Sequence, residues 1–170
     1  MMHKVICSLG MMLPVLGVAF NGFAADCVNI SGKWKGLCTV TDENGTMPPL
    51  AQELEAIQVG CASLQFSSEQ GPGDVVPFGS VFKKTETYPD GTETTTTMNL
   101  QWNSDKTGFS IQGEMNGTYF MANGKKGSYI SSATGSIKLE NNELVSTSNS
   151  KYESPEYKSD SVTVCRYTKM

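Results

Sequence analysis

Cysteine and histidine are the residue types in this chain that bear most directly on chemistry, and both are scarce. The only histidine is His3, close to the N-terminus. Because Ser-His-Asp and Cys-His catalysis need an imidazole, and most zinc and iron sites use one, a mature chain without residue 3 lacks these options. The five cysteines are Cys7, Cys27, Cys38, Cys61 and Cys165.

Carboxylates remain as candidates for acid–base chemistry. Glu114 and Glu140 belong to no recognisable pair, and most other acids fall in turns or at polar positions of the predicted strands. No Walker loop, G-x-S-x-G or G-x-G-x-x-G motif occurs, and the acidic stretch 42–45 lacks the spacing of a calcium-binding EF-hand. The sequence therefore predicts no enzymatic activity, no cofactor and no metal site.

The N-terminal segment has the anatomy of an export signal. Lys4 supplies the positive start, residues 5–20 are mostly apolar, and Gly22-Phe23-Ala24-Ala25 offers the small residues of a cleavage site. The apolar run is shorter than the roughly 20 residues that a spanning helix needs. We expect residues 1–25 to be a cleaved signal peptide and residues 26–170 to be one domain, periplasmic or secreted, that does not insert into the membrane.

The net charge of the mature chain argues against one class of partner. Of the 13 Lys and Arg residues, Lys4 leaves with the signal, so 12 remain against 17 Asp and Glu. A negative protein repels phosphate backbones, and nucleic acid is therefore not an expected partner.

Four cysteines remain after the signal, an even number in a compartment that oxidises thiols, which favours two disulfides. Four cysteines allow three pairings. We predict Cys38–Cys61, because these residues are expected on neighbouring strands, and Cys27–Cys165, because this bond would join the two ends of the domain. A zinc site is the alternative use of these thiols, but no C-x-x-C spacing supports it.

The sequence of the mature chain predicts strands that are joined by hairpin turns. Apolar and polar residues alternate with a period of two, short Gly- and Asn-rich clusters separate the runs, and only residues 48–55 suggest a helical turn or two. Because closure removes both exposed edges of a meander, the predicted fold is all-β, a single eight-stranded antiparallel up-and-down barrel. Its strands are expected near 30–41, 55–66, 75–88, 92–103, 108–121, 127–139, 143–152 and 160–169.

The inward positions of these strands mix a few large side chains with many Gly, Ser and Ala. An eight-stranded barrel is just wide enough to be filled by side chains or to hold one small ligand, and small inward residues favour a cavity. Complete filling of the interior by Met and aromatic side chains is the alternative. The residues expected to line the cavity are Trp102, Met98, Leu100, Phe109, Met115, Tyr119, Met121 and Tyr129.

The motif Gly32-Lys33-Trp34, at the start of the first predicted strand, resembles the G-x-W pattern of lipocalins and the wider calycin superfamily. The resemblance implies that Trp34 plugs the closed end of the barrel and that a basic residue near the end of the last strand packs across it. Arg166, the only arginine, is the candidate for that residue. Ile30 to Trp34 is also similar, more weakly, to the opening of avidin-type barrels. The T-D-Y motif of lipocalins is absent, so the resemblance implies the fold and not the ligands.

The sequence is compatible with two functions. The first is a lipocalin-like protein that binds a small, mostly apolar ligand inside the barrel. The second is an envelope or secreted interaction module, such as a protease inhibitor or an accessory factor, that binds a protein partner through the 42–54 loop. That loop carries Met47, Pro48, Pro49, Leu50 and Leu54.

Overall fold

The computed structural model describes residues 26–68 and 71–170, so the predicted signal peptide lies outside the described residues. Within these ranges the chain forms twelve strands and no helix, and hence no helix that could cross a membrane. The strands are β1 Gly32–Asp42, β2 Gly45–Thr46, β3 Leu50–Val59, β4 Ser63–Ser68, β5 Gly71–Pro72, β6 Val76–Pro77, β7 Val81–Thr87, β8 Glu93–Trp102, β9 Gly108–Phe120, β10 Lys126–Glu140, β11 Glu143–Glu153 and β12 Lys158–Lys169.

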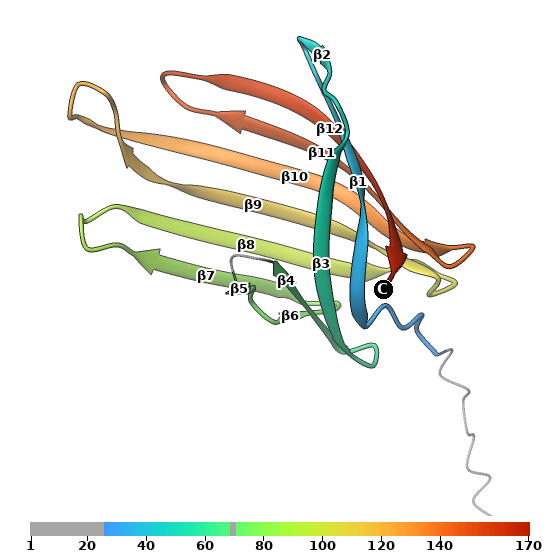
Figure 1. Cartoon of the computed structure of the whole chain (residues 1–170). Helices are drawn as coiled ribbons and strands as arrows, with labels where there is room; N and C mark the ends of the chain where they lie inside the picture. Colours follow the sequence, from blue (N-terminus) through green and yellow to red (C-terminus); the bar gives the residue numbers. More distant parts are fainter. Residues whose placement is uncertain (1–25, 69–70) are drawn as a thin grey trace, which may run out of the picture.

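The strands form one curled sheet (Figure 1). Its order is β5-β4-β3-β1-β12-β11-β10-β9-β8-β7, with β2 paired to β1 and β6 paired to β4, and the pairs of named strands are antiparallel. The prediction of an all-β antiparallel fold is confirmed. The five strands predicted between residues 92 and 169 correspond to β8 to β12, because their long alternation and turn residues agree. Asn141 and Asn142, for instance, both have positive φ angles, 51° and 66°, as a tight type I′ hairpin requires.

The sheet is a half-barrel, and the closed eight-stranded barrel that the sequence predicted is not what the structure shows. The two sides of the sheet are joined at one end only, through the segment 76–79. There the N–H of Phe78 donates to the carbonyl of Ala62 at 2.8 Å, and the N–H of Gly79 donates to the carbonyl of Leu100 at 2.8 Å. Elsewhere β5 and β7 end the sheet as separate edges. Pro72 and Pro77 lie in the short strands on this side, and proline cannot donate to a ladder, which limits closure.

Residues 48–66 also differ from the prediction. The strand expected at 55–66 is two strands, β3 and β4, separated by a turn in which Gly60 has a φ of 53°. The helical turn expected at 48–55 is instead the first half of β3, where Ala51 pairs with Leu37. The ladder to β1 satisfies this backbone, so tertiary pairing overrides a sequence with weak strand preference.

The hydrophobic core occupies the joined end of the half-barrel. Trp34 is 2% exposed, and its indole N–H donates to the carbonyl of Ile30 at 2.8 Å. Phe109 meets Trp102 edge to face, with ring centroids 5.3 Å apart. The buried core residues are Ile30, Trp34, Cys38, Ala56, Leu64, Val76, Leu100, Phe109, Ile137, Leu144, Cys165 and Tyr167.

The position of Arg166 corrects the role that the resemblance implied for it. Side chains alternate along a strand. On β12, Cys165 and Tyr167 therefore point into the hydrophobic core and Arg166 points to the outside. Its guanidinium lies 3.4 Å from the carboxylate of Glu143 on the exposed surface. Lys169 is the residue opposite Trp34, and its ammonium lies 5.6 Å from the centroid of the Trp34 ring. The cation across the tryptophan is therefore Lys169.

The predicted disulfide pairing is wrong, although two disulfides form. Cys38 bonds to Cys165 and Cys27 bonds to Cys61. Cys38 and Cys165 are directly paired residues of β1 and β12, whereas Cys61 lies in the turn between β3 and β4, where it holds the N-terminal segment. The prediction failed because it placed Cys61 on the strand beside Cys38. Two disulfides indicate an oxidising environment.

Glycine at position 36 is required for the close approach of β1 and β12. A Cβ atom there would lie 2.1 Å from the carbonyl oxygen of Arg166. We expect Gly36→Ala to lower the free energy of unfolding by about 1–3 kcal/mol, measured by urea denaturation, because the strands must move apart. Gly113→Ala is the control, since its Cβ would meet nothing closer than Met98 Cγ at 3.7 Å. Equal midpoints for Gly36→Ala and the wild type would contradict this account of the contact.

Candidate ligand-binding face

The inner face of the half-barrel is the face that carries the core. Directly paired residues of antiparallel strands share a face. The register therefore extends this face outward from Leu100, Phe109 and Ile137 along the strands β8 to β12. Beyond the core, its positions are Thr94, Thr96, Met98, Gly113, Met115, Gly117, Tyr119, Gly127, Tyr129, Ser131, Ala133, Gly135, Ser146, Ser148, Ser150, Tyr152, Ser159, Ser161 and Thr163.

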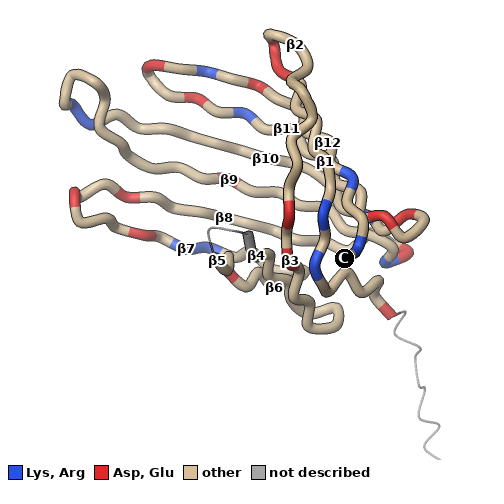
Figure 2. Tube along the Cα trace, in the orientation of Figure 1, with Lys and Arg blue, Asp and Glu red and all other residues tan. Residues whose placement is uncertain are grey.

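No inner-face position of β8 to β12 between Thr94 and Tyr167 is charged, in the strands as the structure describes them. Apart from Lys169 at the end of β12, which lies over Trp34, the charged side chains of these strands lie on the outer face, for example Glu114, Lys138 and Lys151. Figure 2 shows the same strands as long uncharged stretches, with much of the charge at turns and strand ends. On β7 the same face carries Lys84 and Glu86, which form an ion pair with each other. From β8 to β12 up to Tyr167 the inner face therefore suits neutral ligands, apolar or hydroxylated.

The predicted lining residues separate into two groups, of which the first belongs to the core. Leu100 and Phe109 are 3% and 2% exposed. Met98 and Trp102 are partly buried against them, and the indole N–H of Trp102 donates to the carbonyl of Cys61 at 3.1 Å. At this end the interior is filled by side chains.

The second group lies on the open half of the inner face. Met115 is 39% exposed, Tyr119 and Tyr129 are partly exposed, and Met121 lies at the rim near Gly127. Next to Met115 the sheet is hollowed into a shallow recess of about 150 Å³, which we call the trough. Thr96, Met98, Gly113, Met115, Ser131 and Ala133 line it from the inner face, and Thr97 and Glu114, at outer positions, also border it.

A row of four tyrosines crosses the open rim beyond the trough. Ring centroids lie 6.4 Å apart between Tyr119 and Tyr129, 5.9 Å between Tyr129 and Tyr152, and 6.1 Å between Tyr152 and Tyr157. We call these residues the tyrosine row. Tyr119 and Tyr129 were predicted from the sequence to line the cavity, whereas Tyr152 and Tyr157 were not. The alternation of β11 already placed Tyr152 on the inner face, whereas Tyr157 lies in a turn that no periodicity describes.

Two glycines leave room for rings of the tyrosine row to lie against the sheet. A Cβ atom on Gly127 would lie 3.0 Å from Cε1 of Tyr119, and one on Gly117 would lie 3.0 Å from the hydroxyl of Tyr129. The Tyr129 hydroxyl is 2.9 Å from Oγ1 of Thr94. The ends of these two rings are fixed, since the hydroxyl of Tyr119 also donates, to Glu156 at 3.1 Å.

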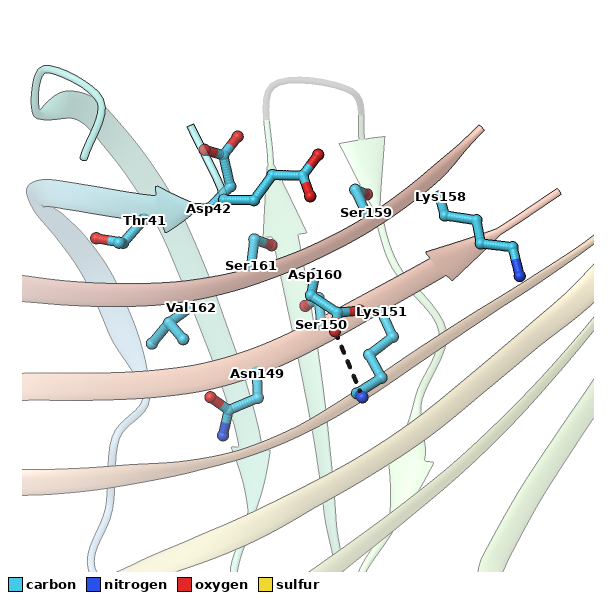
Figure 3. A pocket seen from close by; sticks show the side chains of 11 residues that line it. Thr41, Asp42, Asn149, Ser150, Lys151, Lys158, Ser159, Asp160, Ser161 and Val162 are labelled. Carbon is cyan, nitrogen blue, oxygen red and sulfur yellow. Dashed lines mark ion pairs between the residues drawn. The ribbon is translucent and has the colours of Figure 1, made fainter. Parts of the chain in front are cut away.

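A larger recess, with a volume of about 740 Å³, lies where β12 extends past the end of β1 (Figure 3). We call it the rim groove. It wraps around the free edge of β12, with Ser150, Ser159 and Ser161 from the inner face and Lys151 and Asp160 from the outer face. The two outer residues form an ion pair at 3.5 Å. The rim groove thus adds charged side chains beside inner-face positions of β11 and β12 that are uncharged.

Of the described residues with shifted pKa values, Lys84 on β7 lies beside the trough, because it pairs with Thr96, and hydrogen bonds to Glu86 and Asp74 raise its pKa. The others lie in turns or in the core. Hydrogen bonds from the hydroxyl and N–H of Thr92 lower the pKa of Asp90 in a turn, and bonds from Thr107 do the same for Asp105. Burial raises the pKa of Tyr167 in the core. Across residues 26–68 and 71–170, no three His, Cys, Asp or Glu residues gather closely enough to hold a metal ion.

No protein family model, curated protein or solved structure matches this chain. The geometry of the inner face is therefore the basis for a functional proposal.

Proposed function

We propose that this chain is an exported, lipocalin-like binding protein without enzymatic activity, which takes a small, mostly apolar ligand in the trough. The two disulfides support a periplasmic or extracellular location. The observation on which the proposal depends is the uncovered apolar surface of the trough, where Met115 remains 39% exposed beside Met98 and Ala133.

Two physical features favour an apolar ligand at this place. Exposed apolar surface in a concave site is covered favourably by an apolar molecule, at about 25 cal/mol per Å². Methionine is flexible and polarisable, so Met98 and Met115 can adapt to ligands of different shape. The trough is also preformed between paired strands, which lowers the entropy lost on binding.

The substitution Gly113→Leu fills the trough and tests this proposal. A Cβ atom on Gly113 meets Met98 Cγ at 3.7 Å, an ordinary contact, so the larger side chain enters the trough without striking the backbone. We expect the wild type to bind the fluorescent probe N-phenyl-1-naphthylamine and Gly113→Leu to bind it about tenfold more weakly, because the apolar surface is already covered.

The matched control for this experiment is Gln112→Leu, one residue earlier on β9 and at an exposed outer-face position. It adds the same kind of apolar side chain outside the trough, and its affinity for the probe should equal that of the wild type. Absence of probe binding to the wild type, or equal affinity in Gly113→Leu, would overturn the proposal.

A second candidate function is supported by exposed apolar residues in the segment 42–54. This segment contains β2 and the first half of β3. It is therefore largely strand, and not the loop that the sequence predicted. Met47 and Leu50 are 43% and 53% exposed, and a contiguous exposed apolar surface suits a protein partner. Filling the trough with Gly113→Leu separates the two functions, since docking of a protein on this segment would be unaffected.

A further inference from the structure

The inner face next to the trough changes from apolar to hydroxylated side chains. On β11 and β12, Ser150 pairs with Ser161, Ser148 pairs with Thr163, and Tyr152 pairs with Ser159. We call the serines and threonine of these pairs the hydroxyl lane. It begins at the tyrosine row and continues toward the core between two strands that have no charged inner-face residue there. A purely apolar ligand would leave these hydroxyls without partners, at a free-energy cost.

We propose that the tyrosine row and the hydroxyl lane form a second site, which binds a neutral saccharide chain. Sugar rings present hydroxyls at their edges and C–H groups on their faces. The hydroxyls of the lane can both donate and accept hydrogen bonds with sugar hydroxyls. The negative faces of the tyrosine rings attract the C–H groups of a sugar ring that lies on them.

The geometry of the tyrosine row favours a chain of sugars over a single one. Its successive ring centroids are about 6 Å apart, so the four rings follow one another along the rim. Tyr119 and Tyr129 are held in place by hydrogen bonds to Glu156 and Thr94. Fixed rings lose little conformational freedom on binding, which favours affinity.

The rim groove offers room for such a chain to continue beyond the sheet. Ser150, Ser159 and Ser161 line both the hydroxyl lane and the rim groove, so the two are continuous. Asp42 and Asn149 also line the groove, and Figure 3 shows their side chains at its wall. A carboxylate and an amide are strong partners for sugar hydroxyls.

The distribution of charge separates a saccharide from anionic ligands. Phosphate groups are recognised by Arg and Lys, and no such residue faces the hydroxyl lane. Lys151 and Lys158, at the rim groove, are paired with Asp160 and Glu153. Among the described residues, an anionic chain would therefore meet no cation on the hydroxyl lane and only paired cations at the rim groove.

Calorimetric titration with neutral oligosaccharides tests the proposal. Cellohexaose, chitohexaose and maltohexaose are the probes, and a hexamer of galacturonic acid is the charged comparison. We expect at least one neutral probe to bind the wild type with a Kd of about 1 mM or lower, and Tyr152→Ala and Tyr157→Ala to weaken it about tenfold. Tyr152→Phe should keep the affinity within about twofold, because the ring face makes the contact.

The control is Phe120→Ala, which removes an aromatic ring of β9 that is 48% exposed on the outer face. It should bind the saccharide like the wild type, and all variants should retain the thermal midpoint of a folded protein. The proposal would be overturned if no neutral oligosaccharide binds, if only the galacturonic acid hexamer binds, or if Phe120→Ala weakens binding as much as Tyr157→Ala.

The same variants distinguish this site from the proposed apolar site. The inference shares with the proposed function only the use of the inner face. Tyr157 lies in the turn between β11 and β12. The substitution Tyr157→Ala should therefore leave the binding of N-phenyl-1-naphthylamine unchanged. Gly113→Leu should weaken probe binding about tenfold and retain saccharide binding. If only one of the two proposed sites exists, the protein will therefore bind one of the two ligands and not the other.

Discussion

Replacing Cys38 and Cys165 together by alanine is expected to lower the free energy of unfolding by about 2–5 kcal/mol. The two residues are separated by 127 positions, so their bond restricts most of the unfolded chain. They are also nearly completely buried, at 1% and 5% exposure, between β1 and β12. Loss of the bond frees the first long strand from the last. Urea denaturation of the double variant, followed by circular dichroism, measures the change.

The second disulfide provides the comparison for this prediction. Cys27 and Cys61 are 34 positions apart, so in the chain-entropy model their bond contributes about 1 kcal/mol less. The double variant Cys27→Ala/Cys61→Ala should therefore be the more stable of the two. A Cys27→Ala/Cys165→Ala protein would break both bonds and expose two free thiols to a labelling reagent. One intact disulfide in that protein would contradict the pairing seen here.

The sequence was most informative where local rules are strong. The strands β8 to β12 were predicted because alternation persists over ten residues or more and because turns such as Asn141-Asn142 require positive φ angles. The segment Leu50–Val59 was misread because its apolar residues do not alternate strictly. Its strand conformation comes from pairing with β1, and every one of these pairs joins residues more than ten positions apart in sequence.

Closure was the step that local patterns could not decide. Whether an antiparallel meander closes depends on its two edges meeting, and here they meet through a single bridge between Phe78 and Leu100. The same contact decides which inward positions are buried. Leu100 and Phe109 lie near it and belong to the core, whereas Met115 and Tyr129 lie beyond it and stay accessible. Alternation identified all four as inward but could not separate them.

The cation opposite Trp34 shows a related limit of inference by resemblance. The resemblance of Gly32-Lys33-Trp34 to the lipocalin motif implied a basic residue across the tryptophan, and Arg166 was predicted by residue type. Strand register, which is a property of the pairing between β1 and β12, places Lys169 there instead. A one-residue change of register would reverse every inward and outward position of a strand. The position of a residue in the alternation of its strand therefore predicts which residue faces Trp34 better than residue type does.

Replacing Trp34 by alanine is expected to lower the free energy of unfolding by about 3–5 kcal/mol. Trp34 is among the largest fully buried side chains, and truncation leaves a cavity at the joined end that β1 and β3 cannot refill without breaking their ladder. Ile30, whose carbonyl accepts the indole N–H, also loses that partner. The change in free energy is measured by urea denaturation at a temperature where both proteins are folded.

Two further substitutions show whether this loss comes from the core itself. Trp102→Ala removes an indole that is only partly buried and should cost less than Trp34→Ala. Trp34→Phe keeps an aromatic ring but leaves the carbonyl of Ile30 unpaired, which should cost about 1–3 kcal/mol. Because the tyrosine row lies at the open rim, away from Trp34, a folded Trp34→Phe protein should bind oligosaccharide like the wild type. A parallel loss of stability and saccharide affinity would mean that the joined end and the open face are not independent.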